Sequence, residues 1–141
     1  MTARATRSAR DQRGSTIVEF ALVVPLLVTV LLGILQYGYH YWALETGAAS
    51  AREAARRMAV GTAEACTTAE AVARVGGPAV GSRTPTATVT YVSGRTVGGV
   101  VRVTVTFDSL DLHFLPLPDD GRITQTAEAR IENVPEADLT C

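Results

Sequence analysis

The sequence predicts an α+β fold, in which a long N-terminal transmembrane helix precedes a small domain with a short helix and an antiparallel three-stranded sheet. Between Glu19 and Glu45 no residue is charged, and a helix of about 25 residues extends roughly 37 Å, enough to cross a bilayer core of about 30 Å. An amphipathic stretch with apolar residues at helical spacing follows. Three later segments then alternate between apolar and polar residues, as half-buried strands do.

Length, charge and cysteine count limit the function classes. The chain has 141 residues, which suits one domain of ordinary size. Its net charge of -1 leaves no dominant basic surface, so we expect no nucleic acid partner. It has 2 cysteines, Cys66 and Cys141, and an even count in an exported chain favours one disulfide. Two free thiols are the alternative.

A basic leader, residues 1–14, lies directly before the apolar run. It carries four arginines against the single acid Asp11 and has no apolar periodicity, so residues 1–13 are predicted to be disordered when free. The positive-inside rule places this end in the cytoplasm and everything after residue 45 outside.

One long helix is predicted over residues 15–60, with its transmembrane part at about 17–39. Pro25 removes a backbone hydrogen bond and is expected to bend the helix near Ala21. Aromatic residues then crowd into one short stretch, which is typical of a membrane interface. Core aromatics of a soluble domain are the alternative reading. These residues are Tyr37, Tyr39, Tyr41 and Trp42.

The predicted outer domain spans residues 61–141. Gly61 is a signal for the end of the long helix, and Thr62 can cap a second helix over 63–75. Strands are predicted over 86–92, 100–107 and 122–132, joined as a meander whose apolar face the amphipathic helix covers. The inward residues of the strands are Ala87, Val89, Tyr91, Val101, Val103, Val105, Phe107, Ile123, Ala127, Ala129 and Ile131.

The start of the apolar run holds a specific pattern of residues. Gly14 and Ser15 follow the basic Arg13, and the pair Glu19–Phe20 comes shortly after. This spacing resembles the cleavage motif of type IV prepilins. The longer stretch from Gly14 to Arg56, with its "VPL" segment and "AREAAR", closely resembles the TadE family of minor pilins or pseudopilins from tight-adherence (Flp) pilus systems. Gln36 departs from the family, since many members have an acid there.

The resemblance implies a pilin-like fold and a structural role in pilus assembly. A prepilin peptidase would cut between Gly14 and Ser15, guided by Arg13 and the Glu19–Phe20 pair. The other implied partners are pilins, the inner-membrane assembly platform and membrane lipid. The protein would sit in the cytoplasmic membrane as a single-pass chain, with its C-terminal domain outside or within a surface pilus.

Cleavage would create a new ammonium on Ser15, with or without an N-methyl group. An unpaired charge among packed apolar helices is very costly, so Glu19 is expected to neutralise that ammonium, most simply on a neighbouring subunit. Alternatively, Glu19 only reaches the lipid head groups near a helix end.

No enzymatic or cofactor site is predicted. His40 and His113 are far apart, and the nearby acids Asp108, Asp111, Asp119 and Asp120 do not have EF-hand spacing, so we expect solvated loop acids and no metal. No small-molecule substrate is implied.

Two rival functions stay open. In the first, the helix only tethers an extracytoplasmic binding module that never enters a pilus. In the second, "GAASA" before Arg52 serves as a signal-peptidase site and the protein is released after Ala51, although the stretch from Gln36 is long and aromatic for such a site.

Overall fold

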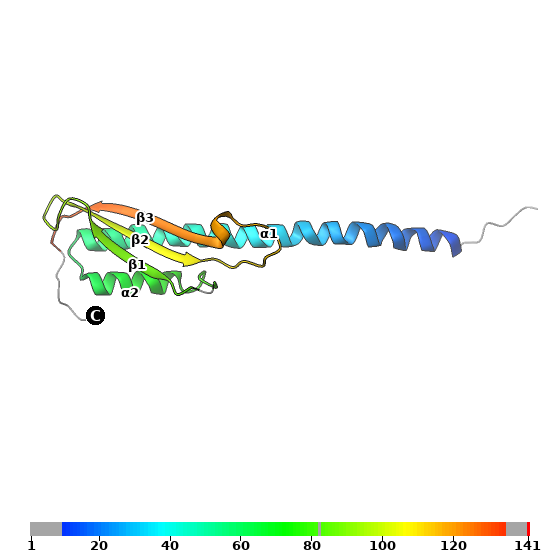
Figure 1. Cartoon of the computed structure of the whole chain (residues 1–141), viewed down its shortest axis with the longest axis horizontal. Coiled ribbons are helices and arrows are strands. Elements are labelled where there is room, and N and C mark those ends of the chain that lie inside the picture. Colours follow the sequence, from blue (N-terminus) through cyan, green and yellow to red (C-terminus); the bar gives the residue numbers. More distant parts are fainter. Residues whose placement is uncertain (1–9, 82, 135–140) are drawn as a thin grey trace, which may run out of the picture. The chain divides into compact units, whose positions relative to one another are not determined.

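The computed structural model describes residues 10–81, 83–134 and 141, and for residues 10–15 the backbone path only. The chain divides after Leu35 into two compact units, called here the N-terminal and the C-terminal unit. The predicted α+β class is confirmed (Figure 1). In chain order the elements are α1 (Arg10–Ala59), α2 (Glu64–Val75), β1 (Thr86–Tyr91), β2 (Val100–Asp108), the 3-10 turn η1 (Pro118–Gly121) and β3 (Arg122–Arg130).

Helix α1 begins earlier than predicted. It starts at Arg10 and not at Ser15, so the last residues of the leader are helical and the expected disorder is wrong there. Arginine and glutamine are good helix formers, and Arg10, Gln12 and Arg13 extend the helix toward the N-terminus despite lacking apolar periodicity. Residues 1–9 lie outside the described part of the chain.

The three strands form the predicted antiparallel meander in the order β1-β2-β3. The strands end close to the predicted bounds, although β3 ends at Arg130, two residues early. The register aligns the predicted inward faces row by row, since Val103 on β2 pairs with Val89 on β1 and with Ala127 on β3. A register slip of one residue would turn each of these side chains to the opposite face.

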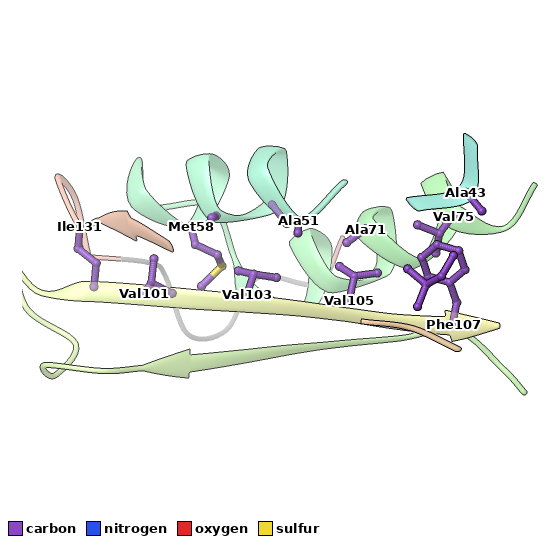
Figure 2. Close-up of a cluster of buried hydrophobic side chains, with 13 residues drawn as sticks. Ala43, Ala51, Met58, Ala71, Val75, Val101, Val103, Val105, Phe107 and Ile131 are labelled. Carbon is purple, nitrogen blue, oxygen red and sulfur yellow. The ribbon is translucent and has the colours of Figure 1, made fainter. Parts of the chain in front are cut away.

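The core of the C-terminal unit lies between the sheet and two helices. Figure 2 shows Val101, Val103, Val105 and Phe107 along β2, pointing toward the side chains of α1 and α2. The helical residues here are mostly alanines, whose small side chains let the helices approach the sheet closely. The buried helical residues of the cluster are Ala43, Ala51, Ala54, Ala55, Met58, Ala71 and Val75.

The end of α1 confirms one predicted signal and corrects another. Gly61 has φ +95, and its N–H donates to the carbonyl of Met58 (3.3 Å), while Thr62 N–H donates to the carbonyl of Arg57 (3.0 Å). This is a Schellman motif. Thr62 therefore completes α1, and it does not cap α2, whose N-cap is Ala63 without a side-chain hydrogen bond. Glu132 N–H and Asn133 N–H also donate to Ala59 O.

Polar contacts fix α2 to its neighbours. The buried hydroxyl of Ser50 on α1 donates to Ala71 O at 2.9 Å, and Arg57 forms an ion pair with Glu70. Tyr91 on β1 donates its hydroxyl to the carboxylate of Glu64 at 3.3 Å. Burial raises the pKa of Tyr91, and the negative charge of Glu64 raises it further.

Candidate membrane and assembly segment

The N-terminal unit presents an apolar surface. Between Thr16 and Leu35 twelve large apolar side chains are 42% to 74% exposed. In the described part of the chain one helix is long and apolar enough to cross a membrane, which suggests a single-pass anchor. An exposed apolar surface of this extent needs lipid or other helices to cover it. Its members are Ile17, Val18, Phe20, Leu22, Val23, Leu26, Leu27, Val28, Val30, Leu31, Ile34 and Leu35.

The predicted processing residues lie at the start of this surface. The backbone of Arg13, Gly14 and Ser15 is helical. Glu19 is exposed among apolar neighbours, and Phe20 is 69% exposed. A carboxylate on such a surface needs polar or charged groups around it once the surface is covered, because burying a charge is costly.

Pro25 lies inside α1, which stays helical on both sides of it. The hydroxyl of Thr29 donates to Pro25 O at 2.7 Å. The expected bend near Ala21 stays a prediction.

Some of the predicted interface aromatics are only exposed, whereas others bind loops of the C-terminal unit through their hydroxyls. Tyr41 and Trp42 are 67% and 52% exposed. Tyr37, 44% exposed, donates its hydroxyl to Pro116 O at 2.8 Å. Tyr39 donates to Pro78 O at 3.3 Å, and its ring meets that of Trp42 edge to face at 5.4 Å. Two of the three tyrosine hydroxyls therefore fasten α1 to loops of the C-terminal unit, a role that the sequence did not indicate.

Gln36 is buried and makes three hydrogen bonds that the sequence did not predict. It is 1% exposed, and its Nε2 donates to Leu115 O (2.9 Å) and to Asp111 Oδ1 (3.3 Å), while its Oε1 accepts from Leu115 N–H (3.3 Å). The amide thus clamps the loop that joins β2 to η1. A carboxylate at this position could not donate either bond. A lone polar residue in an apolar run was the available signal.

A second contact of α1 lies one helical turn farther along. His40 is 6% exposed, and its Nδ1 lies 2.8 Å from the hydroxyl of Ser109. The Ser109 hydroxyl donates to Gly121 O at 3.1 Å, and Ser109 N–H donates to the same carbonyl. His40 therefore binds the first residue of the loop, Ser109, which in turn binds Gly121 at the end of η1. The bond to Ser109 gives the buried His40 ring a polar partner.

The four acids near the loop do not share one environment. Asp108 is the last residue of β2, is buried, and pairs with Arg83 at 3.1 Å, so its expected solvated loop position is wrong. Asp111 accepts from Gln36 and from His113 N–H. Asp119 and Asp120 are exposed in η1. Among the described residues no three His, Cys, Asp or Glu side chains gather as metal ligands.

An open cavity of about 790 Å³ lies between α1 and the start of β3. Tyr37, His40 and Tyr41 line one side, and Asp119, Asp120 and Arg122 contribute charges of both signs.

The cysteines lie at disulfide distance, as predicted. The Sγ atoms of Cys66 and Cys141 are 2.08 Å apart and their Cα atoms 5.3 Å. The bond joins α2 to Cys141 across 75 positions of sequence.

In a comparison with known protein families, residues 14–56 match the family described as TadE-like protein. The predicted resemblance to the TadE-like family is confirmed. The TadE-like segment, as residues 14–56 are called from here on, covers Gly14, the apolar surface, Gln36, the four interface aromatics and the alanines of α1 in the core cluster. No curated protein and no solved structure matched the chain. The segment supports a Tad pilus-associated protein with pilins as its general partners.

The Gln36 clamp gives a direct prediction. Gln36→Glu would place a buried carboxylate against the carbonyl of Leu115 and the carboxylate of Asp111, so we expect a loss of about 2–3 kcal/mol in unfolding free energy at pH 7. The measurement is denaturant unfolding of the full chain in detergent. Gln36→Met, of similar volume but uncharged, is the matched control and should lose less. Near pH 5 the Glu variant should recover part of its loss as its carboxyl binds a proton, whereas equal behaviour of both variants at both pH values would contradict the charge argument.

Proposed function

We propose that this chain is a TadE-like pseudopilin, a minor pilin with a structural and not a catalytic role in assembly of a Flp-type tight-adherence pilus. The observation that carries the proposal is the family match over residues 14–56. The apolar surface of the N-terminal unit supports it, because a pilin helix must exchange lipid for neighbouring helices during assembly.

In this proposal, residues 1–14 are a leader that a prepilin peptidase removes at the cytoplasmic face. Residues 15–60 then form the helix whose part at about 17–39 spans the membrane, and residues 61–141 form the domain outside. The basic leader favours this orientation. Partners are the peptidase, other pilins and the inner-membrane assembly platform.

Glu19 has a charge-pairing role in this scheme. The cut would leave an ammonium on Ser15, four residues before Glu19. Within one helix, i and i+4 side chains are neighbours, but in a packed filament the same two charges can also pair between adjacent subunits. Glu19 is exposed, which is the position that pairing with a neighbour requires.

The test of processing is a Gly14→Asp substitution. Glycine leaves room for the peptidase beside the scissile bond, and aspartate adds bulk and charge there. When the variant is co-expressed with a prepilin peptidase, we expect the uncut precursor, about 1.5 kDa heavier than the mature chain at roughly 110 Da per residue, to accumulate. Intact-mass measurement reads both forms.

Gly77→Asp is the matched control, because Gly77 is exposed, lies outside the TadE-like segment and has open space where a Cβ would be placed. This variant should leave processing unaltered. Normal cutting of the Gly14 variant would remove the peptidase from the proposal. A wild-type chain that starts at Ser15 supports the pseudopilin, and one that keeps its leader supports the membrane-anchored binding module.

A further inference from the structure

The loop that joins β2 to η1 carries exposed apolar side chains next to the interface aromatics. Leu112 is 47% exposed and Phe114 is 42% exposed. In a water-soluble loop of this kind such side chains gain nothing from exposure. The stretch from Ser109 to Leu117 contains no lysine or arginine.

The loop is held at one particular place on α1. Gln36 clamps the backbone of Leu115 from both sides, and the hydroxyl of Tyr37 donates to Pro116 O at 2.8 Å. On the far side of the loop, Ser109 binds His40. All these anchors lie on the first turn and a half of α1 within the C-terminal unit.

That place is the end of the apolar run. Gln36 is covalently joined to Leu35, the last residue of the N-terminal unit, and the exposed apolar surface ends there. A loop clamped to Gln36 and Tyr37 is therefore held beside the residues that directly follow the apolar run. Exposed Tyr37, Tyr41 and Trp42 lie within the next two turns of α1, and tyrosine and tryptophan favour the membrane–water boundary.

We propose that this loop, residues 109–117, enters the head-group region of the bilayer through Leu112 and Phe114, so that the C-terminal unit rests on the membrane by a second contact besides its helix. The inference rests on the membrane anchoring in the proposed function. The expected surface is zwitterionic lipid, because the exposed acids Asp119 and Asp120 follow the loop in the sequence and an anionic surface would repel them.

The polar groups of the loop are compatible with this position. The carboxylate of Asp111 already accepts from Gln36 and from His113 N–H. The ring of His113 is 86% exposed and can remain in water while its two apolar neighbours enter the interface, because leucine and phenylalanine need only a shallow insertion.

Tryptophan fluorescence can test the inference, because Trp42 is the single tryptophan of the chain. In a Trp42→Phe background, Phe114→Trp places a probe on the loop. Val97→Trp is the matched control, since Val97 is also apolar, is 67% exposed, and lies before β2 and not after it. The nine residues of β2 separate the two probes by roughly 30 Å. Each full chain is reconstituted in phosphatidylcholine vesicles with brominated acyl chains.

We expect the bromines to quench the Phe114→Trp probe at least about twofold more than the Val97→Trp probe, with the strongest effect from bromines near the head groups. Leu112→Trp is a second loop probe in case Phe114→Trp does not fold. Equal quenching of the loop and control probes would overturn the inference. The wild-type Trp42 reports separately on anchoring: quenched Trp42 with an unquenched loop rejects the loop contact alone, whereas absence of both signals also rejects the membrane-anchored pseudopilin.

Discussion

Glu19→Ala should give a chain that is inserted and cut but no longer assembles. The substitution keeps Gly14, the basic leader and the apolar helix, so the peptidase still has its substrate. In the filament, however, the ammonium created on Ser15 would be buried without its opposite charge. Breaking a buried pair from one side typically costs about 3–5 kcal/mol, equivalent to a loss of more than a hundredfold in an assembly equilibrium.

Two companion variants make the result specific. Glu19→Gln should be nearly as damaging, since the amide accepts a hydrogen bond but has no charge. Glu45→Ala removes another exposed acid of α1, beyond the uncharged run, and should assemble normally. The readouts are the mass of the mature chain, co-purification with other pilins and pilus yield. Normal cutting together with normal assembly of Glu19→Ala would show that Glu19 only reaches the head groups.

Removal of the disulfide should cause the largest loss of stability. A bond that closes a loop of 75 positions stabilises by about 4 kcal/mol in the chain-entropy model. At about 4–8 °C per kcal/mol for a domain of this size, Cys66→Ser should lower the Tm by about 16–32 °C. Thermal unfolding of the full chain in detergent measures it.

A set of cysteine variants can distinguish one Cys66–Cys141 disulfide from two free thiols. If a single disulfide is lost, then Cys66→Ser, Cys141→Ser and the double variant should all melt at the same temperature, as should the reduced wild type. Non-reducing alkylation of the wild type should find no free thiol. Quantitative labelling of both cysteines, or additive effects of the two substitutions, would contradict the pairing.

The sheet could be predicted because its signal is local. Strand faces follow a period of two that the sequence displays directly, and the observed rows, such as Val89–Val103–Ala127, combine three independently predicted faces. The apolar run and the helix end at Gly61 were equally local signals. The matched TadE-like segment added the motif around Gly14, which no periodicity could supply.

The loop contacts could not be predicted, because their partners lie far apart in sequence. Gln36 binds Asp111 and Leu115, which lie 75 and 79 positions later in the sequence. Neither Gln36 nor the loop lies in a sequence pattern that predicts this contact. Two of the corrections have a different cause, because the residue type suggested the wrong element. Thr62 looks like an N-cap, but it still belongs to the Schellman motif that ends α1, and the N-cap of α2 is the next residue, Ala63. Asp108 looks like a loop acid, but the ladder opposite Arg122 extends β2 through it.

The core combines segments that are far apart in the sequence, which has a consequence for the timing of folding during synthesis. Ala51, Ala55 and Met58 of α1 pack into one cluster with Ile123 and Ile131, and the N–H groups of Glu132 and Asn133 bind the carbonyl of Ala59. Until the ribosome has added the roughly 70 residues between these segments, which takes roughly 4–14 s, the inner face of α1 and the valines of β2 have no complete cover. The C-terminal unit can therefore complete its core only near the end of synthesis.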